Sequence, residues 1–191
     1  MTMIGDNEYG IPEVVKVDAL TNDLVVITQD HHGIDQKIAF TLAHKFANIA
    51  PAGTAFLYFV TPAITSGLVH FKPSLLTSDG PNVDVEMYEG GTVAANGTGL
   101  TPINRHRYNP VASAMVDTFF HTPTTPSPTL RIDSDFLGGG TGVGVSKTGA
   151  GAIGENEIVL NPGTKYFIKV TNNGAGTVNV HLKLFWYEET Y

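Results

Sequence analysis

The feature that most constrains the fold is the strict alternation of residues 177–189, TVNVHLKLFWYEE, near the end of the chain. Its apolar side chains share one face: Val178, Val180, Leu182, Leu184 and Trp186. The other face carries Asn179, His181, Lys183, Phe185 and Tyr187. A period of two over this length predicts a long β-strand with one face in a core.

The preceding apolar segment, KYFIKV (165–170), is expected to pair with this strand as a hairpin. Asn172, Asn173 and Gly174 supply the turn residues for it. The predicted core anchors are Trp186, Leu184, Leu182, Phe167 and Tyr166. Trp186 is the only tryptophan of the chain.

The rest of the chain predicts a series of short strands separated by turns. The expected strands are 24–28, 54–60, 68–72, 82–90, 113–121, 129–136 and 157–160. Residues 36–46 fit a strand or a helix, and we favour a strand because the neighbouring segments are strands. Residues 138–154 are too rich in glycine for a core element. The pattern is typical of an all-β protein, a β-sandwich of the jelly-roll type (24–191) with a short N-terminal arm (1–23).

Composition narrows the possible functions. The absence of cysteine excludes disulfides and cysteine-ligated zinc. A net charge of −7 disfavours nucleic-acid binding, which needs a basic stripe. We find no signal peptide and no apolar run of membrane-spanning length, so no membrane contact is expected. Charged residues make up only 15% of the chain, against about 25% in typical domains, which favours a protein with large protein-covered surfaces.

No group of residues has the spacing of a catalytic or metal site. The densest metal-type cluster is Asp30, His31, His32 and Asp35, which His44, His70 or His181 would have to complete. Adjacent histidines of a strand face opposite ways, so no metal is expected. The phosphate-loop pattern fails at Ser146, before Lys147. The carboxylates Asp84, Glu86, Asp133 and Asp135 suggest glycoside chemistry, but a solvated strand face is the preferred interpretation. We therefore predict no enzyme and no cofactor.

One segment, INRHRYNP (103–110), concentrates basic and aromatic side chains. Arginine and tyrosine are favoured anchors of protein interfaces, so Arg105, His106, Arg107 and Tyr108 are candidate protein-contact residues. The alternative is that the two arginines satisfy local carbonyls and carboxylates, and the sequence supports both interpretations equally.

Four stretches resemble a known family. They are HHGIDQKIAF (31–40), FLYFVTP (56–62), EMYEGGTVAANGTGLTPINRHRYNP (86–110) and EIVLNPGTKYFIKVTNNGAGTVNVHLKLFWYEE (157–189). In this order they resemble the capsid decoration, or cement, proteins of tailed bacteriophages. The chain departs from that pattern in a longer, proline-rich loop at 121–128. The resemblance implies no enzyme and no cofactor.

The resulting expectation is a virion protein that binds the outer surface of the assembled head and stabilises it. Its partners would be the major capsid protein and further copies of itself, with a trimer favoured and a dimer possible. It would be made in the bacterial cytoplasm and reside on the capsid surface. The first alternative is a fibre-attachment or receptor-binding module on head or tail that holds a glycan. The second is a cupin-like or carbohydrate-active enzyme.

Overall fold

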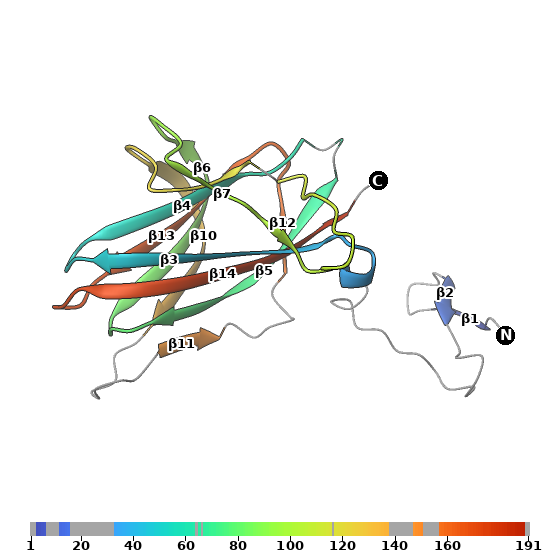
Figure 1. Ribbon diagram of the computed structural model, residues 1–191, viewed down its shortest axis with the longest axis horizontal. Coiled ribbons are helices and arrows are strands. Elements are labelled where there is room, and N and C mark those ends of the chain that lie inside the picture. Colours follow the sequence, from blue (N-terminus) through green and yellow to red (C-terminus); the bar gives the residue numbers. More distant parts are fainter. Residues whose placement is uncertain are drawn as a thin grey trace.

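The computed structural model of the chain is almost entirely β-structure (Figure 1). The described residues are 3–6, 12–15, 33–63, 65, 67–115, 117–137, 147–150 and 157–189. The expected strand at 24–28, the expected boundary after residue 23, and His31 and His32 lie outside these residues. Within the described ranges, no helix is long and apolar enough to cross a membrane.

Two large antiparallel sheets make up most of the fold. The first, called the β13 sheet, has the strand order β10–β6–β13–β4–β9–β7. Its strands are β10 (Ser127–Leu137), β6 (Val83–Thr92), β13 (Lys165–Asn172), β4 (Thr54–Val60), β9 (Phe119–His121) and β7 (Thr98–Leu100). The second, called the β14 sheet, has the order β11–β5–β14–β3–β8, and β12 also pairs with β5. Its strands are β11 (Lys147–Ala150), β5 (Leu68–Ser78), β14 (Val178–Glu189), β3 (Ala39–Ile49), β8 (Ile103–Asn104) and β12 (Ile158–Leu160).

A two-stranded sheet and a helical turn lie outside the two large sheets. β1 (Met3–Asp6) and β2 (Pro12–Val15) pair antiparallel with one another. Residues 33–35 form a single helical turn just before β3. The segment 36–46, whose pattern fits both a strand and a helix, contributes to strand β3, as predicted.

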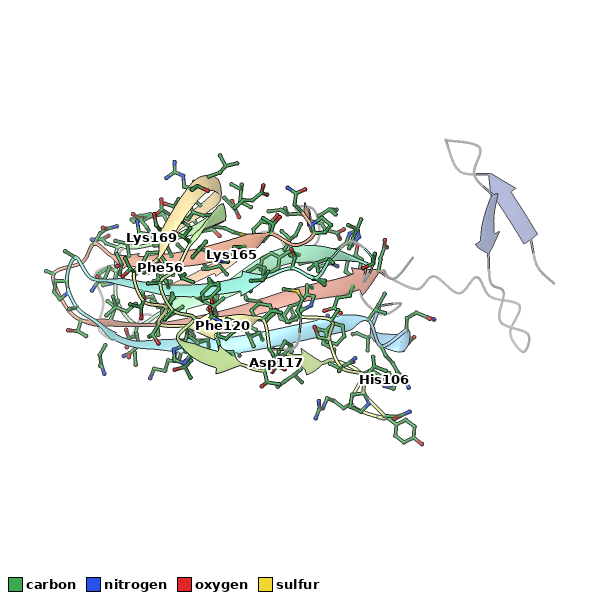
Figure 2. All side chains as sticks on the ribbon, turned by 90° about the horizontal axis from the view of Figure 1, so that it is seen from above. Phe56, His106, Asp117, Phe120, Lys165 and Lys169 are labelled. Carbon is green, nitrogen blue, oxygen red and sulfur yellow. The ribbon has the colours of Figure 1, made fainter. Side chains whose placement is uncertain are left out.

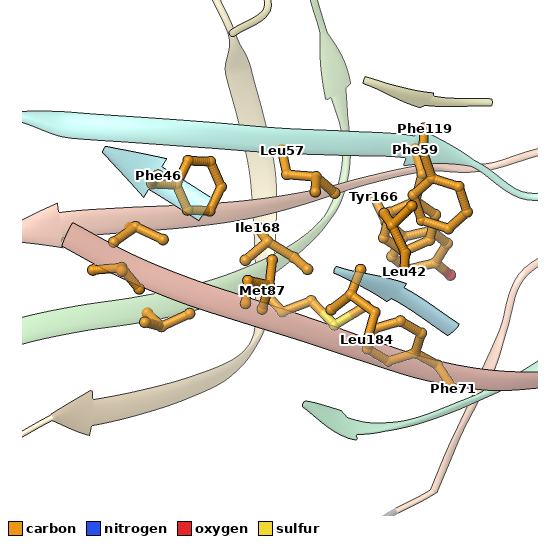
Figure 3. Packing of buried hydrophobic residues seen from close by; sticks show 14 of the residues in the cluster. Leu42, Phe46, Leu57, Phe59, Phe71, Met87, Phe119, Tyr166, Ile168 and Leu184 are labelled. Carbon is orange, nitrogen blue, oxygen red and sulfur yellow. The ribbon is translucent and has the colours of Figure 1, made fainter. Parts of the chain in front are cut away.

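Apolar side chains from alternating positions of both sheets fill the space between them (Figure 3). Leu42 and Leu184 enter this core from the β14 sheet, and Leu57, Met87 and Ile168 enter it from the β13 sheet. An all-β sandwich is therefore confirmed, because each sheet buries one face against the other.

The C-terminal strand supplies the largest core side chain. Trp186 is 2% exposed, and its ring stacks on Phe40 at 5.9 Å between centroids and contacts Phe119 at 5.0 Å. The other side chains of the predicted buried face are also buried: Val178, Val180, Leu182 and Leu184. The last strand thus provides a central part of the core.

The predicted hairpin between β13 and β14 is wrong. β14 pairs with β3 and β5, whereas β13 pairs with β4 and β6 in the other sheet. The physical reason lies in Asn172, which is fully buried at the end of β13. Its amide donates hydrogen bonds to the carbonyls of Ile49 (2.9 Å) and Gly176 (2.7 Å), and its oxygen accepts from the N–H of Gly174 (2.9 Å). These bonds shape a turn that carries the chain from one sheet to the other.

Tyr166 and Phe167 are adjacent on β13 and therefore point to opposite faces. Tyr166 lies in the core between the sheets. Phe167 is also fully buried, but on the outer face of the β13 sheet, where it stacks on Tyr58 at 5.6 Å. Tyr58 in turn stacks on Phe120 of β9 at 5.2 Å. A smaller aromatic cluster therefore lies outside the main core.

Two expected segments differ from the structure. Within the described part of the predicted strand at 113–121, only Phe119–His121 pairs as a strand, because buried hydrogen bonds hold Ser113 and its neighbours in a turn. Part of the glycine-rich segment, Lys147–Ala150, pairs with the end of β5 as β11, whereas no regular element is expected there from its composition.

Candidate functional site

The basic cluster of the sequence lies in a loop of residues 101–112, called the basic loop. Asn104 at its start is 5% exposed and ties the loop together. Its amide donates to the carbonyls of Lys37 (2.6 Å) and Val111 (3.1 Å), and its oxygen accepts from the N–H of His106 (2.8 Å). Asn109 takes a left-handed conformation (φ 51°), which asparagine tolerates better than most residues. The loop is therefore a shaped element with internal hydrogen bonds.

A buried carboxylate fixes the chain just after the basic loop. Glu188 of β14 is 6% exposed and accepts hydrogen bonds from the Ser113 hydroxyl, the Ala114 N–H (2.7 Å) and the Trp186 indole N–H (2.9 Å). The Ser113 hydroxyl oxygen also accepts from the N–H of Met115 (2.9 Å). Ser113 is thus committed to a structural network that joins residues 113–115 to the C-terminal strand.

The start of the basic loop packs on the outer face of the β14 sheet. The Arg105 guanidinium lies 5.4 Å from the ring centroid of Phe185, and the Lys183 ammonium lies 4.9 Å from the same ring. Such cation–π contacts contribute about 0.5–1 kcal/mol each at exposed sites. Neither cation has a carboxylate partner among the described residues. Within the described residues, Arg105 thus has an aromatic ring and no carboxylate as its neighbour, and it adds positive charge to this surface.

The rest of the basic loop presents its side chains to solvent. Tyr108 is 85% exposed, and Ile103 and Val111 are about half exposed. Arg107 is exposed and has no hydrogen-bond or ion-pair partner in the described part of the chain. His106 is half-buried, and Figure 2 shows it away from the two sheets. Exposed tyrosine, arginine and aliphatic side chains on a fixed loop have the composition of a protein-contact surface.

Of the histidines proposed for a metal site, the structure places His44 on β3, His70 on β5 and His181 on β14. His70 Nδ1 lies 2.5 Å from Glu157 Oε1, and its Nε2 lies 3.3 Å from Glu189 Oε2 without hydrogen-bond geometry. The two carboxylates thus contact different ring nitrogens and do not converge on one point. Within the described ranges, no group of three or more histidine, cysteine, aspartate or glutamate residues is arranged to hold a metal ion.

His44 and His121 form a separate pair between the two sheets. Their ring centroids are 4.4 Å apart, with His44 on β3 and His121 on β9. Burial lowers the pKa of His44, and the neighbouring His121 lowers it further, because both disfavour a positive charge on the His44 ring. This contact joins the β14 sheet to the β13 sheet near their β8 and β7 edges.

The carboxylates proposed for glycoside chemistry lie on β6 and β10. A hollow of about 190 Å³ is lined by Asp84, Glu86, Arg131, Ser134, Asp135 and Phe136. Glu86 pairs with Arg131 (2.9 Å) and with Lys169 (3.1 Å), and Asp84 accepts from the Asn173 amide (2.7 Å). Burial and the neighbouring Asp133 raise the pKa of Asp135. Glu86 and Asp84 are thus largely occupied by structural partners.

The basic cluster was predictable from the sequence, but the residues that contact the basic loop and the chain next to it were not. Phe185, Lys183 and Glu188 lie far along the chain from the basic loop, and no local pattern connects them. The alternation of β14 does place Phe185 and Lys183 together on the face away from the core. It gives no sign that Arg105 covers that face.

Comparison of the chain with protein families, with characterised proteins and with solved structures finds no match.

Proposed function

We propose that the chain is a structural protein of a tailed-phage virion, a decoration or cement protein that binds the outer surface of the assembled head and stabilises it. It acts without catalysis or cofactor, through contacts with the major capsid protein and with other copies of itself. Contact with nucleic acid or membrane plays no part in this role. The protein is made in the bacterial cytoplasm and then joins the capsid surface.

The observation that carries this proposal is the basic loop. It holds Ile103, Tyr108 and Val111, three of the large hydrophobic side chains that are exposed within the described residues. Because hydrogen bonds from Asn104 hold the loop in shape, little conformational entropy is lost when a partner binds it. Arg105 and Arg107 add positive charge, which favours an acidic partner surface.

The strand order supports the finer assignment to the jelly-roll type. The strands β3, β4, β5 and β6 alternate between the two sheets in chain order. One sheet contains the sequence of neighbours β3–β14–β5–β11 and the other contains β4–β13–β6–β10. Two sheets of four such strands support the assignment, because jelly rolls are eight-stranded double Greek keys, an architecture used by viral capsid proteins and by lectins. The strands β7, β8 and β9 are then an insertion that carries the basic loop.

The second candidate is a fibre-attachment or receptor-binding module that holds a glycan. Its supporting observation is Phe136, which is 61% exposed beside the carboxylates and Arg131 of the β6–β10 hollow. An open aromatic ring beside hydrogen-bonding side chains suits a sugar, whose apolar face stacks on the ring while its hydroxyls bond the polar groups.

Cosedimentation with heads of the parent particle that lack this protein tests the proposal. The purified chain should pellet with these heads to a saturable level and should raise the temperature at which they release their contents. Binding to host-cell glycans with no binding to heads would contradict the proposal and would favour the receptor-binding module.

A further inference from the structure

The outer face of the β14 sheet continues from the basic loop over the neighbouring strands β3 and β14 (Figure 1). The outward positions of these two strands are Thr41, Ala43, Lys45, His181, Lys183 and Phe185. Ile103 of β8 pairs with Thr41 and is 49% exposed, so it extends the same face. We call these side chains, together with Arg105, the basic face.

The register of the sheet arranges the basic face in three rows. The rows are Ile103, Thr41 and Phe185; Ala43 and Lys183; and Lys45 and His181. The first row is mostly apolar, and each of the other two carries a lysine. Since a strand rises about 3.3 Å per residue, neighbouring rows lie about 7 Å apart and the three rows extend over about 13 Å.

The charge of the basic face is opposite to the net charge of −7 of the whole chain. Arg105, Lys183 and Lys45 supply three cations, whereas the outward positions from 41 to 45 and from 181 to 185 hold no carboxylate. Beyond this stretch, Asp79 accepts two hydrogen bonds from Asn179, each of 2.6 Å. A positive surface on an acidic chain favours a partner that brings negative charge to this place.

The ring of Phe185 holds two of the cations in position. The Arg105 guanidinium lies 5.4 Å from its centroid and the Lys183 ammonium lies 4.9 Å from it. Within the described residues, neither side chain donates a hydrogen bond or forms an ion pair. Their N–H groups thus remain available to a carboxylate, which can accept two parallel hydrogen bonds from a guanidinium.

We infer that the basic face binds an extended, carboxylate-rich protein segment, whose acidic side chains pair with Arg105, Lys183 and Lys45. An apolar side chain of this segment packs on Phe185 and Ile103. About five residues of extended chain cover 13 Å, and acidic residues at alternate positions match the spacing of the rows. The inference deepens the proposed function and rests on it for the source of the segment, which is the major capsid protein.

Binding of fluorescent poly-L-glutamate, measured by anisotropy at pH 7 in low salt, tests the chemistry of this face without heads. The natural chain should bind it despite its own net negative charge, and high salt should weaken the binding because it screens exposed charges. Lys45→Glu and Lys183→Glu should each weaken binding by about tenfold. Lys183→Arg keeps the charge and should bind like the natural chain.

A matched variant separates this face from the overall charge of the chain. Lys165→Glu makes the same change of net charge on β13, in the other sheet, and should weaken binding by less than about twofold. Circular dichroism should show that every variant is folded. Absence of poly-L-glutamate binding by the natural chain, or equal weakening by Lys165→Glu and Lys183→Glu, would overturn the inference.

Cosedimentation with heads tests the source of the segment. Lys183→Glu should bind heads about tenfold more weakly than the natural chain, and Lys165→Glu should bind them equally well. Head binding that Lys183→Glu leaves unchanged would overturn the inference while the proposed function stands. A natural chain that binds poly-L-glutamate but not heads would contradict the proposed function and would leave the basic face as a site for acidic segments.

Two other occupants give different results. Tighter binding of a DNA oligonucleotide than of poly-L-glutamate of equal charge would assign the face to nucleic acid. Self-association of the natural chain in sedimentation velocity, lost in Lys183→Glu, would assign it to a second copy. Either result would overturn the inference.

Discussion

Removal of the Glu188 carboxylate should both destabilise the fold and loosen the chain next to the basic loop. In Glu188→Ala, three donors lose their acceptor: the Ser113 hydroxyl, the Ala114 N–H and the Trp186 indole N–H. Each buried donor without an acceptor costs about 1–3 kcal/mol. The indole is the most deeply buried of the three, whereas Ala114 is exposed and its N–H is more easily hydrated.

We therefore expect the free energy of unfolding to fall by about 2–4 kcal/mol. For a chain of 191 residues this lowers the melting temperature by roughly 4–16 °C. The free energy of unfolding of Glu188→Gln should lie between those of the natural chain and of Glu188→Ala. The glutamine amide keeps one acceptor oxygen, but its NH2 group is a donor and faces other donors. Glu189→Gln is the matched control. The Glu189 side chain is about half exposed and, among the described residues, pairs with His70 alone, so loss of its charge should lower the free energy of unfolding by less than about 1 kcal/mol.

Urea unfolding followed by tryptophan fluorescence measures this directly, because the only tryptophan of the chain donates one of the three bonds. Trypsin cleavage after Arg105 and Arg107 gives a local measurement, and it should be faster in Glu188→Ala. Ordinary surface substitutions change the free energy of unfolding by up to about 0.5 kcal/mol. A change in Glu188→Ala no larger than this, together with unchanged cleavage, would refute the role assigned to this carboxylate.

Three further outcomes follow from the structure. Trp186→Ala should lower the free energy of unfolding in urea by about 3–5 kcal/mol. Lys183→Ala on the opposite face loses only its contact with the Phe185 ring and should lower it by about 1 kcal/mol or less; equal effects would mean that the two faces of β14 are misassigned. The folded chain lowers the pKa of His44 below its ordinary value of 6.5, so the neutral form is favoured in the fold and stability should be lost as the pH falls below about 6.5. Unfolding free energies at several pH values should show a shallower loss in His44→Gln than in the natural chain, and parallel curves would contradict this. Gly91→Ala should destabilise the fold by about 1–3 kcal/mol, because Gly91 has φ +133° and an added Cβ would lie 2.5 Å from the Ser127 carbonyl oxygen; an unchanged melting temperature in calorimetry would contradict it.

The strand pattern was predictable where burial is one-sided. β14 alternates because one of its faces packs in the core, and the period of two appears directly in its letters. The letters of β3 fit a helix as well, because its buried positions do not follow a period of two over its whole length. The partner of β14 was not predictable from the same letters. The residues of the turn 172–176 are typical of a hairpin connection. In the structure, buried hydrogen bonds from the Asn172 amide to Ile49 and Gly176 shape this turn so that the chain crosses to the other sheet.

The sequence was sufficient to predict that Tyr166 and Phe167 point to opposite faces of β13. Adjacent residues of a strand cannot share a face, so a list that places both in one core is inconsistent with the alternation. What the sequence did not reveal is that the outer face at Phe167 is also covered, by the aromatic rings of Tyr58 and Phe120.

The basic loop was found because its charges stand together in a chain with few charges. The shape of the loop was not predictable. In the sequence Asn104 looks like one of many polar loop residues, although the hydrogen bonds of its side-chain amide define the loop. The sequence grouped Asp84, Glu86, Asp133 and Asp135 by residue type alone, because the strands that adjoin depend on sheet order. Of these four residues, the structure places Asp84, Glu86 and Asp135 in the lining of one hollow.

Electron cryomicroscopy of the parent particle tests the central claim most directly. The account predicts density for this β-sandwich on the outer surface of the head, in symmetric groups, with residues 101–112 of each copy at a contact with a neighbouring protein. Density confined to a tail or fibre, or copies on the head whose 101–112 segment faces open solvent, would contradict it.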